Sequence, residues 1–493
     1  MSAPPIEPLL FIIFGGTGDL ARRKLIPALW RLLVHDGLAD RVAVLGVGTR
    51  ERTDTEFREM ARVSLLDSGA DPEDADAWCA TRLHYQVVGD GPESYGILAD
   101  RITELEQHHT LGGNRAFYLA LPPSVLESTL AGMARAGLGD GPGWTRLVIE
   151  KPFGRDLASA RRLNDLVHAC VDESEAYRID HYLGKETVRN LLVFRFANAL
   201  FERTWNRDHI ESVEITVAES IGVGGRERYY DETGVVRDMI QNHLTQLLTL
   251  VAMEPPVEMG HDAIRSEKVK VLRSVVPPVP DDVVYGQYTA GFVGHDVHGY
   301  TDLPGIPADS TTSTFAAVRL NIENWRWQGV PFFLRAGKRL PERSSRILVR
   351  YRHPPVCLFH SDCPGHENLL VLTLQPDEGF DLYFDVKIPG DEILITEVPL
   401  SVRYGDFADG ITDAYQTLLR DVMEGDQTLF VRADEVEEAW RVYANILDTD
   451  SVDLYPAGTW GPAAADQLVE ASGNVWSEIG LKKQSLGRHQ PGA

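Results

Sequence analysis

A nine-residue segment, residues 178–186, concentrates side chains that can do chemistry. It reads Arg-Ile-Asp-His-Tyr-Leu-Gly-Lys-Glu. Ordering and desolvating so many polar groups costs free energy, which an anionic ligand would offset. His181, Tyr182 and Lys185 are potential donors, and lysine suits a phosphate as a compact point charge. If the segment enters a helix, His181 and Lys185 share one face, and Asp180 is left to orient another group. The alternative is a solvated polar turn.

A predicted helix over 234–253 carries Asp238, Asn242 and His243 on an otherwise apolar pattern. Histidine titrates near neutrality, so His243 suits a base that removes a hydroxyl proton while a hydride leaves the same carbon. Asp180 is a candidate partner to orient its ring. The alternative is a histidine that is satisfied within the core.

Glycines mark the turn after the first apolar run. Gly16, Gly18 and Ala21 fit the G-x-G-x-x-G/A pattern between a predicted strand, 9–14, and a predicted helix, 20–35. A turn without glycine would keep a pyrophosphate away from the backbone at the helix N-terminus. The sequence therefore predicts dinucleotide binding, although the pattern alone also occurs by chance.

The end of the second predicted strand bears on the choice of dinucleotide, because NAD enzymes tend to place an acid there for the ribose 2′-hydroxyl. Thr49 and Arg50 can instead meet a 2′-phosphate, and Arg52 can assist them. Glu51 is the contrary signal. We expect NADP, with NAD left open.

Lys151 follows the fifth predicted strand, 145–150, in the run Glu-Lys-Pro-Phe-Gly. Ligands of open α/β sheets bind at the carboxyl ends of the strands, so Lys151 is expected to contact substrate and cofactor. Lys338 and Arg343 flank a turn after Gly337 and would add positive charge. The alternative for all three is a solvated surface charge.

The elements that must position these groups follow two patterns. Strands and helices alternate over residues 9–150, which predicts a Rossmann-like, doubly wound parallel sheet. Strand-like runs between 314 and 387 have few helices between them and predict a large, mostly antiparallel sheet flanked by helices. We expect an α/β NAD(P)-binding domain over 1–179 and an α+β substrate-binding and oligomerisation domain over 180–493.

Composition excludes some classes of protein. The 493 residues include 48 basic and 73 acidic side chains, a net charge of −25. A general nucleic-acid binder needs a basic surface, so we do not expect this protein to bind nucleic acid. A local basic pocket can still hold a phosphorylated small molecule. No apolar run is as long as the roughly 18 residues that a membrane span requires. The N-terminus lacks the features of a signal peptide. We therefore expect a cytoplasmic protein without a membrane partner.

A histidine- and cysteine-bearing segment raises the question of a metal. Its residues are His353, Cys357, His360, Cys363 and His366. Their spacing matches none of the common zinc patterns, so we expect a polar loop and no metal.

Five of these segments together resemble the glucose-6-phosphate dehydrogenase family, and the resemblance covers essentially the whole chain. They lie at 15–21, 150–154, 178–186, 237–243 and 334–338. The resemblance implies oxidation of D-glucose 6-phosphate at C1 to 6-phospho-D-glucono-1,5-lactone, with hydride transfer to NADP, as the first step of the oxidative pentose phosphate pathway. The alternative is a related dehydrogenase that acts on another hexose 6-phosphate or prefers NAD.

The resemblance also implies a role for each matching residue. His243 is the expected base with Asp180 in support, and His181, Tyr182 and Lys185 form the expected phosphate clamp. The other expected substrate contacts are Lys151, Glu219, Asp238, Lys338, Arg343 and Gln375. The expected cofactor contacts are Gly15, Gly16, Thr17, Gly18, Asp19, Leu20, Thr49, Arg50 and Lys151.

Three further expectations follow from the family. The peptide bond before Pro152 is expected to be cis, and the chain is expected to form homodimers or homotetramers through the antiparallel sheet. The arginine that reads the 2′-phosphate in the family falls on Thr49 here, with Arg50 one position later. This departure leaves NAD or dual use of cofactors open.

Overall fold

The computed structural model divides the chain into two compact units. It describes residues 6–89, 91–356, 358, 367–407 and 413–477. Unit 1 comprises Met1–Glu186, Pro256–Ser266 and Thr412–Glu437, and unit 2 comprises Thr187–Pro255, Glu267–Ile411 and Glu438–Ala493. Unit 1 thus includes two segments from the second half of the chain.

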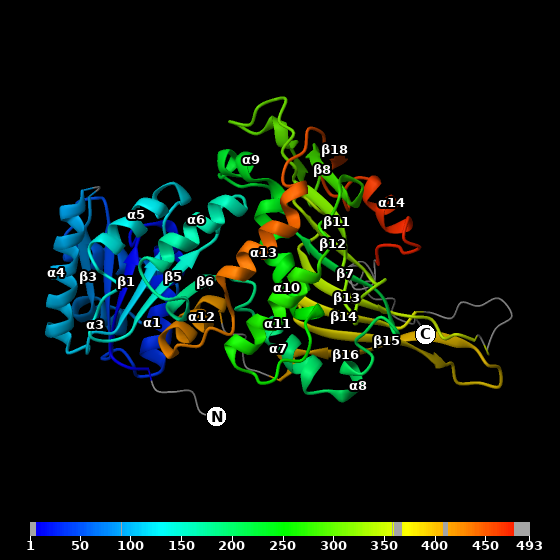
Figure 1. Cartoon of the computed structure of the whole chain (residues 1–493), viewed down its shortest axis with the longest axis horizontal. Helices are drawn as coiled ribbons and strands as arrows, with labels where there is room; N and C mark the ends of the chain where they lie inside the picture. The colour runs from blue at the N-terminus through cyan, green and yellow to red at the C-terminus, as the bar shows by residue number, and fades with distance from the viewer. Residues whose placement is uncertain (1–5, 90, 357, 359–366, 408–412, 478–493) are drawn as a thin grey trace, which may run out of the picture. The chain divides into compact units, whose positions relative to one another are not determined.

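Unit 1 is built on a seven-stranded sheet, sheet A, with the order β17-β6-β5-β4-β1-β2-β3 (Figure 1). Its strands are β1 (Leu9–Phe14), β2 (Val42–Gly48), β3 (Leu83–Val87), β4 (Arg115–Leu119), β5 (Thr145–Glu150), β6 (Ala176–Ile179) and β17 (Phe430–Val431). All are parallel except β17, which pairs antiparallel with β6. Counted from β3 and without β17, the strand order is 3-2-1-4-5-6, which confirms the predicted Rossmann-like sheet. Every residue of β1 is buried, which explains its unbroken apolar run.

Helices cover both faces of sheet A. They are α1 (Ile26–His35), α2 (Asp54–Asp67), α3 (Pro72–Arg82), α4 (Pro92–His109), α5 (Pro123–Arg135), α6 (Leu157–His168) and α12 (Ala414–Glu424). Two groups pack among themselves: α5 contacts α4 and α6 in one, and α1 contacts α2, α3 and α12 in the other (Figure 1). Helix α2 starts at a capping box between Thr53 and Glu56, one of the clearest local start signals.

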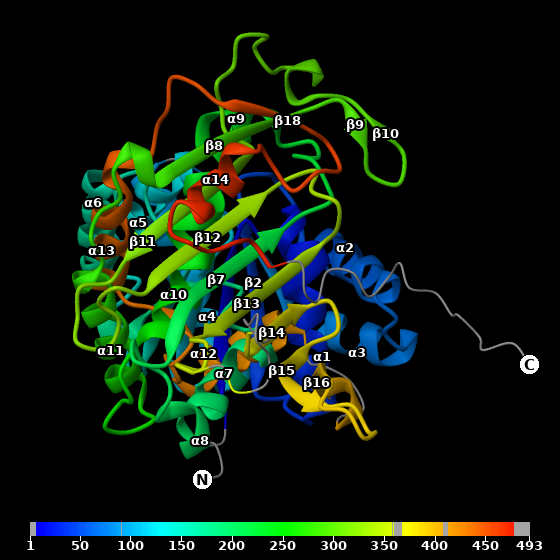
Figure 2. The ribbon, with the colours of Figure 1, turned by 90° about the vertical axis from the view of Figure 1, so that its right-hand side faces the viewer.

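Unit 2 is built on a nine-stranded sheet, sheet B, with the order β16-β15-β14-β13-β7-β12-β11-β8-β18 (Figure 2). Its strands are β7 (Ile210–Ala218), β8 (Val283–Thr289), β11 (Phe315–Asn321), β12 (Pro331–Gly337), β13 (Ser344–Tyr351), β14 (Leu369–Gln375), β15 (Gly379–Lys387), β16 (Ile395–Arg403) and β18 (Asp453–Pro456). Only the pairs β7–β12 and β8–β18 are parallel, which confirms the mostly antiparallel prediction. The short strands β9 (Gly291–Phe292) and β10 (Asp296–Val297) form a separate ribbon.

Most helices after β6 belong to unit 2, and the residues of α7, α11 and α13 are divided between the units. The helices are α7 (Glu186–Phe196), α8 (Ala199–Glu202), α9 (Glu227–Val235), α10 (Thr245–Ala252), α11 (His261–Ser274), α13 (Ala433–Tyr443) and α14 (Ala464–Glu470). Helices α10 and α14 lie on opposite faces of sheet B (Figures 1 and 2). No helix of the described ranges is long and apolar enough to span a membrane.

The prediction of one regular helix over 234–253 is wrong. Gly234 has φ +66° and ψ 172°, so the helical backbone is interrupted there. Residues Val236–Leu244 then form a π-helix, η3, before α10 begins. A π-helical turn holds more residues than an α-helical turn and changes which side chains share a face. The apolar spacing of the sequence could not distinguish the two.

Candidate active site

The glycine loop, residues 15–18, follows β1 and leaves almost no room for side chains. Gly15 has φ +77°, and a Cβ there would lie 2.3 Å from a carbonyl oxygen at the end of β4. A Cβ on Gly16 would lie 2.8 Å from the Cα of Gly46. The N–H groups of Gly15 and Gly16 donate to the carbonyl oxygen of Val47, at 2.9 and 3.0 Å. This close backbone packing fits the approach of a dinucleotide pyrophosphate.

The helix after this loop begins at Asp19, and its first turns are exposed. Residues Ala21–Leu25 form a π-helical turn, η1, that leads into α1. Gly18 and Asp19 face solvent, and Asp19 pairs with Arg23 at 2.8 Å. The first N–H groups of a helix have no partner within it, so this end can receive an anion.

The loop after β2 carries two arginines. Thr49, Arg50 and Glu51 are exposed, whereas Arg52 is half-buried. Neither Arg50 nor Arg52 forms an ion pair with a residue that the structure describes. Their positive charge is therefore left for another anion, and a 2′-phosphate is one that the sequence predicts at this place.

Lys151 follows β5, and its peptide bond to Pro152 is cis, as the resemblance implies. The preceding Glu150 accepts hydrogen bonds from the hydroxyl of Tyr118 and, at 3.4 Å, from that of Tyr415. Burial raises the pKa of Glu150, against the lowering effect of the Tyr118 hydrogen bond and the Lys151 charge. No sequence motif marks these phenols, since only the run around Glu150 indicates the place.

Within the segment 178–186, residues 180–185 form a turn between the end of β6 and the start of α7 at Glu186. Asp180 is 2% exposed, and its Oδ1 accepts from the backbone N–H of Tyr182 at 2.9 Å. The Nζ of Lys185 lies 3.9 Å from the centroid of the Tyr182 ring, and the His181 ring lies 5.1 Å from it. The turn, rather than a helical face, therefore brings the three expected phosphate ligands together.

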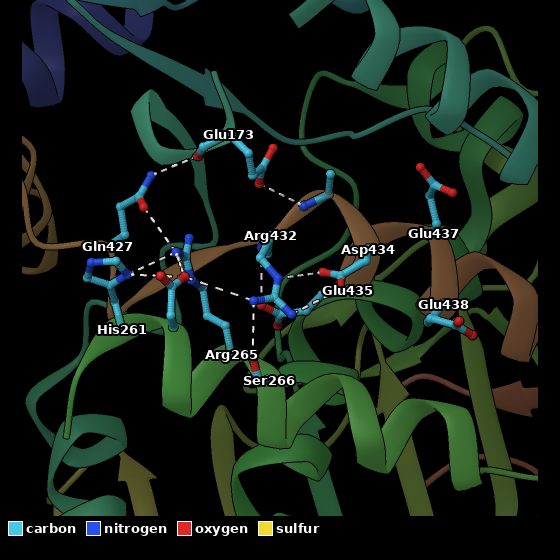
Figure 3. Close-up of polar contacts among 12 residues, drawn as sticks. Glu173, His261, Arg265, Ser266, Gln427, Arg432, Asp434, Glu435, Glu437 and Glu438 are labelled. Carbon is cyan, nitrogen blue, oxygen red and sulfur yellow. Dashed lines mark hydrogen bonds and ion pairs between the residues drawn. The ribbon is translucent and has the colours of Figure 1, made fainter. Parts of the chain in front are cut away.

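Strand β6, which leads into this turn, is anchored by buried polar groups. Gln427 is 1% exposed and donates to the carbonyl oxygens of Glu173 and Ala176, at 3.2 and 3.0 Å. Its Oε1 accepts from Arg265 at 3.0 Å (Figure 3). Arg178 donates to Glu173 at 2.7 Å. Arg178 is thus engaged in holding β6 in place rather than exposed to a ligand.

In unit 2, an ion pair joins the ends of two neighbouring strands. Strands β7 and β12 run parallel, with Ala218 opposite Gly337. The next residue of each strand is Glu219 or Lys338, and Lys338 Nζ donates to Glu219 Oε2 at 2.6 Å. The lysine side chain is 3% exposed and the glutamate side chain 28%. The Nζ also lies 5.0 Å from the centroid of the Tyr230 ring.

Two more expected residues lie at this edge of sheet B. Arg343 precedes β13, whose first residue pairs with Ala218, and Gln375 ends β14. Arg343 donates to the Gln375 side-chain oxygen at 3.3 Å, and Gln375 donates to Ser345 at 2.8 Å. The four charged or amide side chains at this edge come from four separate strand ends.

Helix η3 packs on β7 and β12 and carries the remaining candidates. Asp238 is 8% exposed and His243 is 1% exposed. Burial raises the pKa of Tyr230 well above its ordinary value, and the charges of Asp238 and Glu219 raise it further. Tyr230, which no motif marked, therefore lies beside both of the expected carboxylates.

The histidine- and cysteine-bearing segment lies mostly outside the residues that the structure describes. Cys357, His360, Cys363 and His366 lie outside the described residues. His353 lies 3.4 Å from Glu367.

Comparisons with known proteins match nearly the whole chain to one family. Residues 12–190 match the family model for the glucose-6-phosphate dehydrogenase NAD binding domain, and residues 192–477 match that for the C-terminal domain. Glucose-6-phosphate 1-dehydrogenase of Aggregatibacter actinomycetemcomitans is 45% identical, over 97% of this chain and 99% of the relative. The enzyme of Dickeya dadantii is 42% identical, over 95% and 97%. A solved glucose-6-phosphate dehydrogenase in complex with its substrate glucose-6-phosphate has a TM-score of 0.88 at 34% identity, over 97% of this chain and 100% of that one.

Proposed function

The chain belongs to the glucose-6-phosphate dehydrogenase family, and from this we propose that it oxidises D-glucose 6-phosphate at C1. The C1 hydrogen leaves as a hydride to the nicotinamide, the hydroxyl proton goes to a base, and the new carbonyl makes 6-phospho-D-glucono-1,5-lactone. The observation that carries this proposal is the match of both family models, with relatives that are aligned over nearly their whole length. This reaction is the first step of the oxidative pentose phosphate pathway.

We assign the substrate phosphate to His181, Tyr182 and Lys185. The turn after β6 supports this assignment, because it brings the His181 imidazole and the Lys185 ammonium next to the Tyr182 phenol ring. A phosphate at this place would accept hydrogen bonds from all three groups, and those with the charged lysine would be the strongest.

We assign the base to His243 and the orienting carboxylate to Asp180. Both side chains are almost fully buried, at 1% and 2% exposure, which strengthens any electrostatic interaction that they make. The backbone N–H of Tyr182 fixes one oxygen of Asp180. A base held in one orientation can take the C1 hydroxyl proton as the hydride departs.

We assign the sugar hydroxyls to the acceptors Glu219 and Asp238. Lys338, Arg343 and Gln375 are the proposed donors from the same edge of sheet B, and this is supported by the contacts that link them there. Lys151, at the carboxyl end of β5, is the proposed contact to both substrate and cofactor.

For the cofactor we propose NADP, which when bound supplies the hydride acceptor. The glycine loop and the exposed helix start support a dinucleotide there. The proposed contacts are Gly15, Gly16, Thr17, Gly18, Asp19, Leu20, Thr49, Arg50 and Lys151. Preference for the 2′-phosphate is supported by the two arginines without ion pairs among the described residues, Arg50 and Arg52.

Activity assays with two sugar phosphates and two cofactors test this function. Purified protein is mixed with glucose 6-phosphate and either NADP or NAD, and the absorbance of the reduced cofactor is followed. We expect reduction with NADP at a kcat/KM at least about tenfold above that with NAD, since one charge-assisted contact is worth about that factor. Glucosamine 6-phosphate is the control substrate. Faster turnover of that sugar would reject glucose 6-phosphate as the substrate, and a higher kcat/KM with NAD would reject the cofactor assignment.

We also propose a homodimer or homotetramer that associates through sheet B. Strands β15 and β16 support this, because Ile388, Ile393, Leu394 and Leu400 at this end of the sheet are 41–58% exposed. Light scattering after gel filtration tests it, and the mass of a single chain would contradict it. A cytoplasmic location is proposed because charged sugar phosphates do not cross membranes unaided. Activity confined to a membrane fraction after cell lysis would contradict that location.

A further inference from the structure

Tyr85 on β3 lies beneath the loop that carries the two arginines. Its side chain is only 5% exposed, and its hydroxyl donates to the backbone carbonyl oxygen of Arg50 at 2.9 Å. Its backbone N–H donates to Asp54 Oδ1 at 2.8 Å. Tyr85 therefore contacts the loop at Arg50 and also contacts Asp54, the first residue of α2, where the loop ends.

The end of β2 is shaped to admit this side chain. A Cβ on Gly48 would lie 2.6 Å from the Tyr85 hydroxyl oxygen, and a Cβ on Gly46 would lie 2.5 Å from the ring of Phe57. The rings of Phe57 and Tyr85 pack with their centroids 5.4 Å apart. The Cβ position of Gly48 also lies 3.8 Å from Thr17 Oγ1, so this place borders the glycine loop. Gly48 thus makes room for the Tyr85 hydroxyl, and Gly46 makes room for the Phe57 ring that packs against Tyr85.

The acid next to Tyr85 is paired with other arginines, which leaves Arg50 and Arg52 available for an anionic ligand. Asp54, the nearest acid of α2, contacts Arg101 at 3.2 Å and Arg58 at 3.9 Å. Burial raises the pKa of Tyr85, whereas the positive charges of Arg52 and Arg50 lower it, which places both guanidinium groups near the phenol. The Nε of Arg52 is buried without a hydrogen-bond partner among the described residues.

We propose that Tyr85 is the positioning residue for NADP selectivity, because its hydroxyl holds the Arg50 backbone so that Arg50 and Arg52 face an adenosine 2′-phosphate. The proposal rests on the NADP-linked function proposed above. Tyr85 itself contacts no phosphate in this scheme, so its removal should weaken only ligands that carry the 2′-phosphate. Arg50 is the contact through which it acts.

Calorimetric titration with 2′,5′-ADP and with 5′-AMP tests the proposal without any turnover. In Tyr85→Phe, which removes only the hydroxyl, we expect the Kd for 2′,5′-ADP to rise about fivefold, the worth of one hydrogen bond. The Kd for 5′-AMP should change less than about twofold. The matched control is Tyr95→Phe, since Tyr95 is also buried in unit 1 but packs against Gly132. It should leave both affinities unchanged.

A double-mutant cycle separates positioning from a general loss of structure. If Tyr85 acts through Arg50, then Tyr85→Phe should have little further effect on 2′,5′-ADP in an Arg50→Ala background. Equal weakening of both nucleotides, or an unchanged Kd for 2′,5′-ADP in Tyr85→Phe, would overturn the inference. If the unaltered protein binds 2′,5′-ADP no more tightly than 5′-AMP, the proposed NADP preference fails first. The two failures are therefore distinguishable.

Discussion

At the glycine loop the backbone packs too closely for a side chain, whereas around Lys338 charged side chains are packed almost out of solvent. A Cβ on Gly16 would meet backbone atoms of β1 and β2 within 2.8–3.2 Å. Lys338, by contrast, keeps 3% of its side chain exposed and is held by a carboxylate and an aromatic ring. The proposed cofactor contacts at the glycine loop therefore depend on shape, and the proposed substrate contacts around Lys338 depend on charge.

This difference predicts how each region responds to change. A site made by backbone approach is sensitive to added volume and little affected by pH, because its donors are N–H groups that do not titrate. A site made by buried charges tolerates small changes of shape but depends on every partner remaining ionised and paired. Substitutions in the two regions should therefore fail in different ways.

The largest expected effect is in the charged region. His243→Asn should lower kcat about 10²–10⁴-fold, because the variant lacks the base that we propose for the C1 hydroxyl proton. The KM for glucose 6-phosphate should change little, since the phosphate ligands are intact. Steady-state kinetics with saturating NADP measures both values. Turnover close to that of the unaltered protein would show that another group is the base.

Breaking the buried ion pair should affect stability unequally from its two ends. Glu219→Gln leaves the ammonium of Lys338 buried without a counter-charge, so the free energy of unfolding should fall by about 3 kcal/mol. Lys338→Met leaves a carboxylate that is 28% exposed and can still be hydrated, so the loss should be smaller. Urea unfolding of both variants makes the measurement. Equal losses would contradict the unequal burial as the cause.

The shape-based region should respond to a single methyl group. Gly16→Ala forces the loop to move away from Gly46, which should weaken NADP binding by about 1–3 kcal/mol. The matched control is Gly96→Ala in α4, where an added Cβ meets nothing within 4 Å. Titration with NADP compares them. If both variants bind NADP as the unaltered protein does, close backbone packing is not what the loop contributes.

The smallest effect concerns a titratable pair within unit 1, away from the glycine loop. The Nε2 atoms of His84 and His109 lie 2.9 Å apart, and burial, with the charges of His84 and Arg82, lowers the pKa of His109 from 6.5 to about 4. Because the unfolded chain takes up this proton at a higher pH than the folded chain, stability is lost as pH falls from 6.5 to about 4.

Replacing His109 should therefore make the free energy of unfolding depend less on pH. His109→Gln should reduce the slope of unfolding free energy against pH by less than about 1.4 kcal/mol per pH unit, the limit for one proton. Urea midpoints over this window provide the slope, with His295→Gln as an exposed control. Parallel slopes for His109→Gln and the unaltered protein would contradict the assignment.

The same comparison explains what could be predicted from the sequence. The glycine loop and the segment 178–186 each lie in one short run, so local pattern was enough to mark both as candidate sites. The Glu219–Lys338 pair joins residues 119 positions apart and exists only because β7 and β12 align in parallel. No local spacing encodes that register.

Other parts of the site were missed for related reasons. Tyr85 and Tyr230 are ordinary aromatic residues in sequence, and only tertiary packing places their hydroxyl or ring beside charged groups. The apolar spacing of the stretch around His243 does not distinguish the π-helix that it forms from an α-helix. Strand β17 has only two residues, so its pairing with β6 gives no sequence pattern.

The most direct test of the proposed reaction follows the hydrogen itself. Glucose 6-phosphate that carries deuterium at C1 is incubated with the protein and NADP, and the reduced cofactor is analysed by mass spectrometry. We predict one deuterium in each reduced cofactor and unlabelled oxidised cofactor, because the C1 hydrogen passes directly as a hydride. Reduced cofactor without deuterium, or no reduced cofactor at all, would contradict hydride transfer from C1.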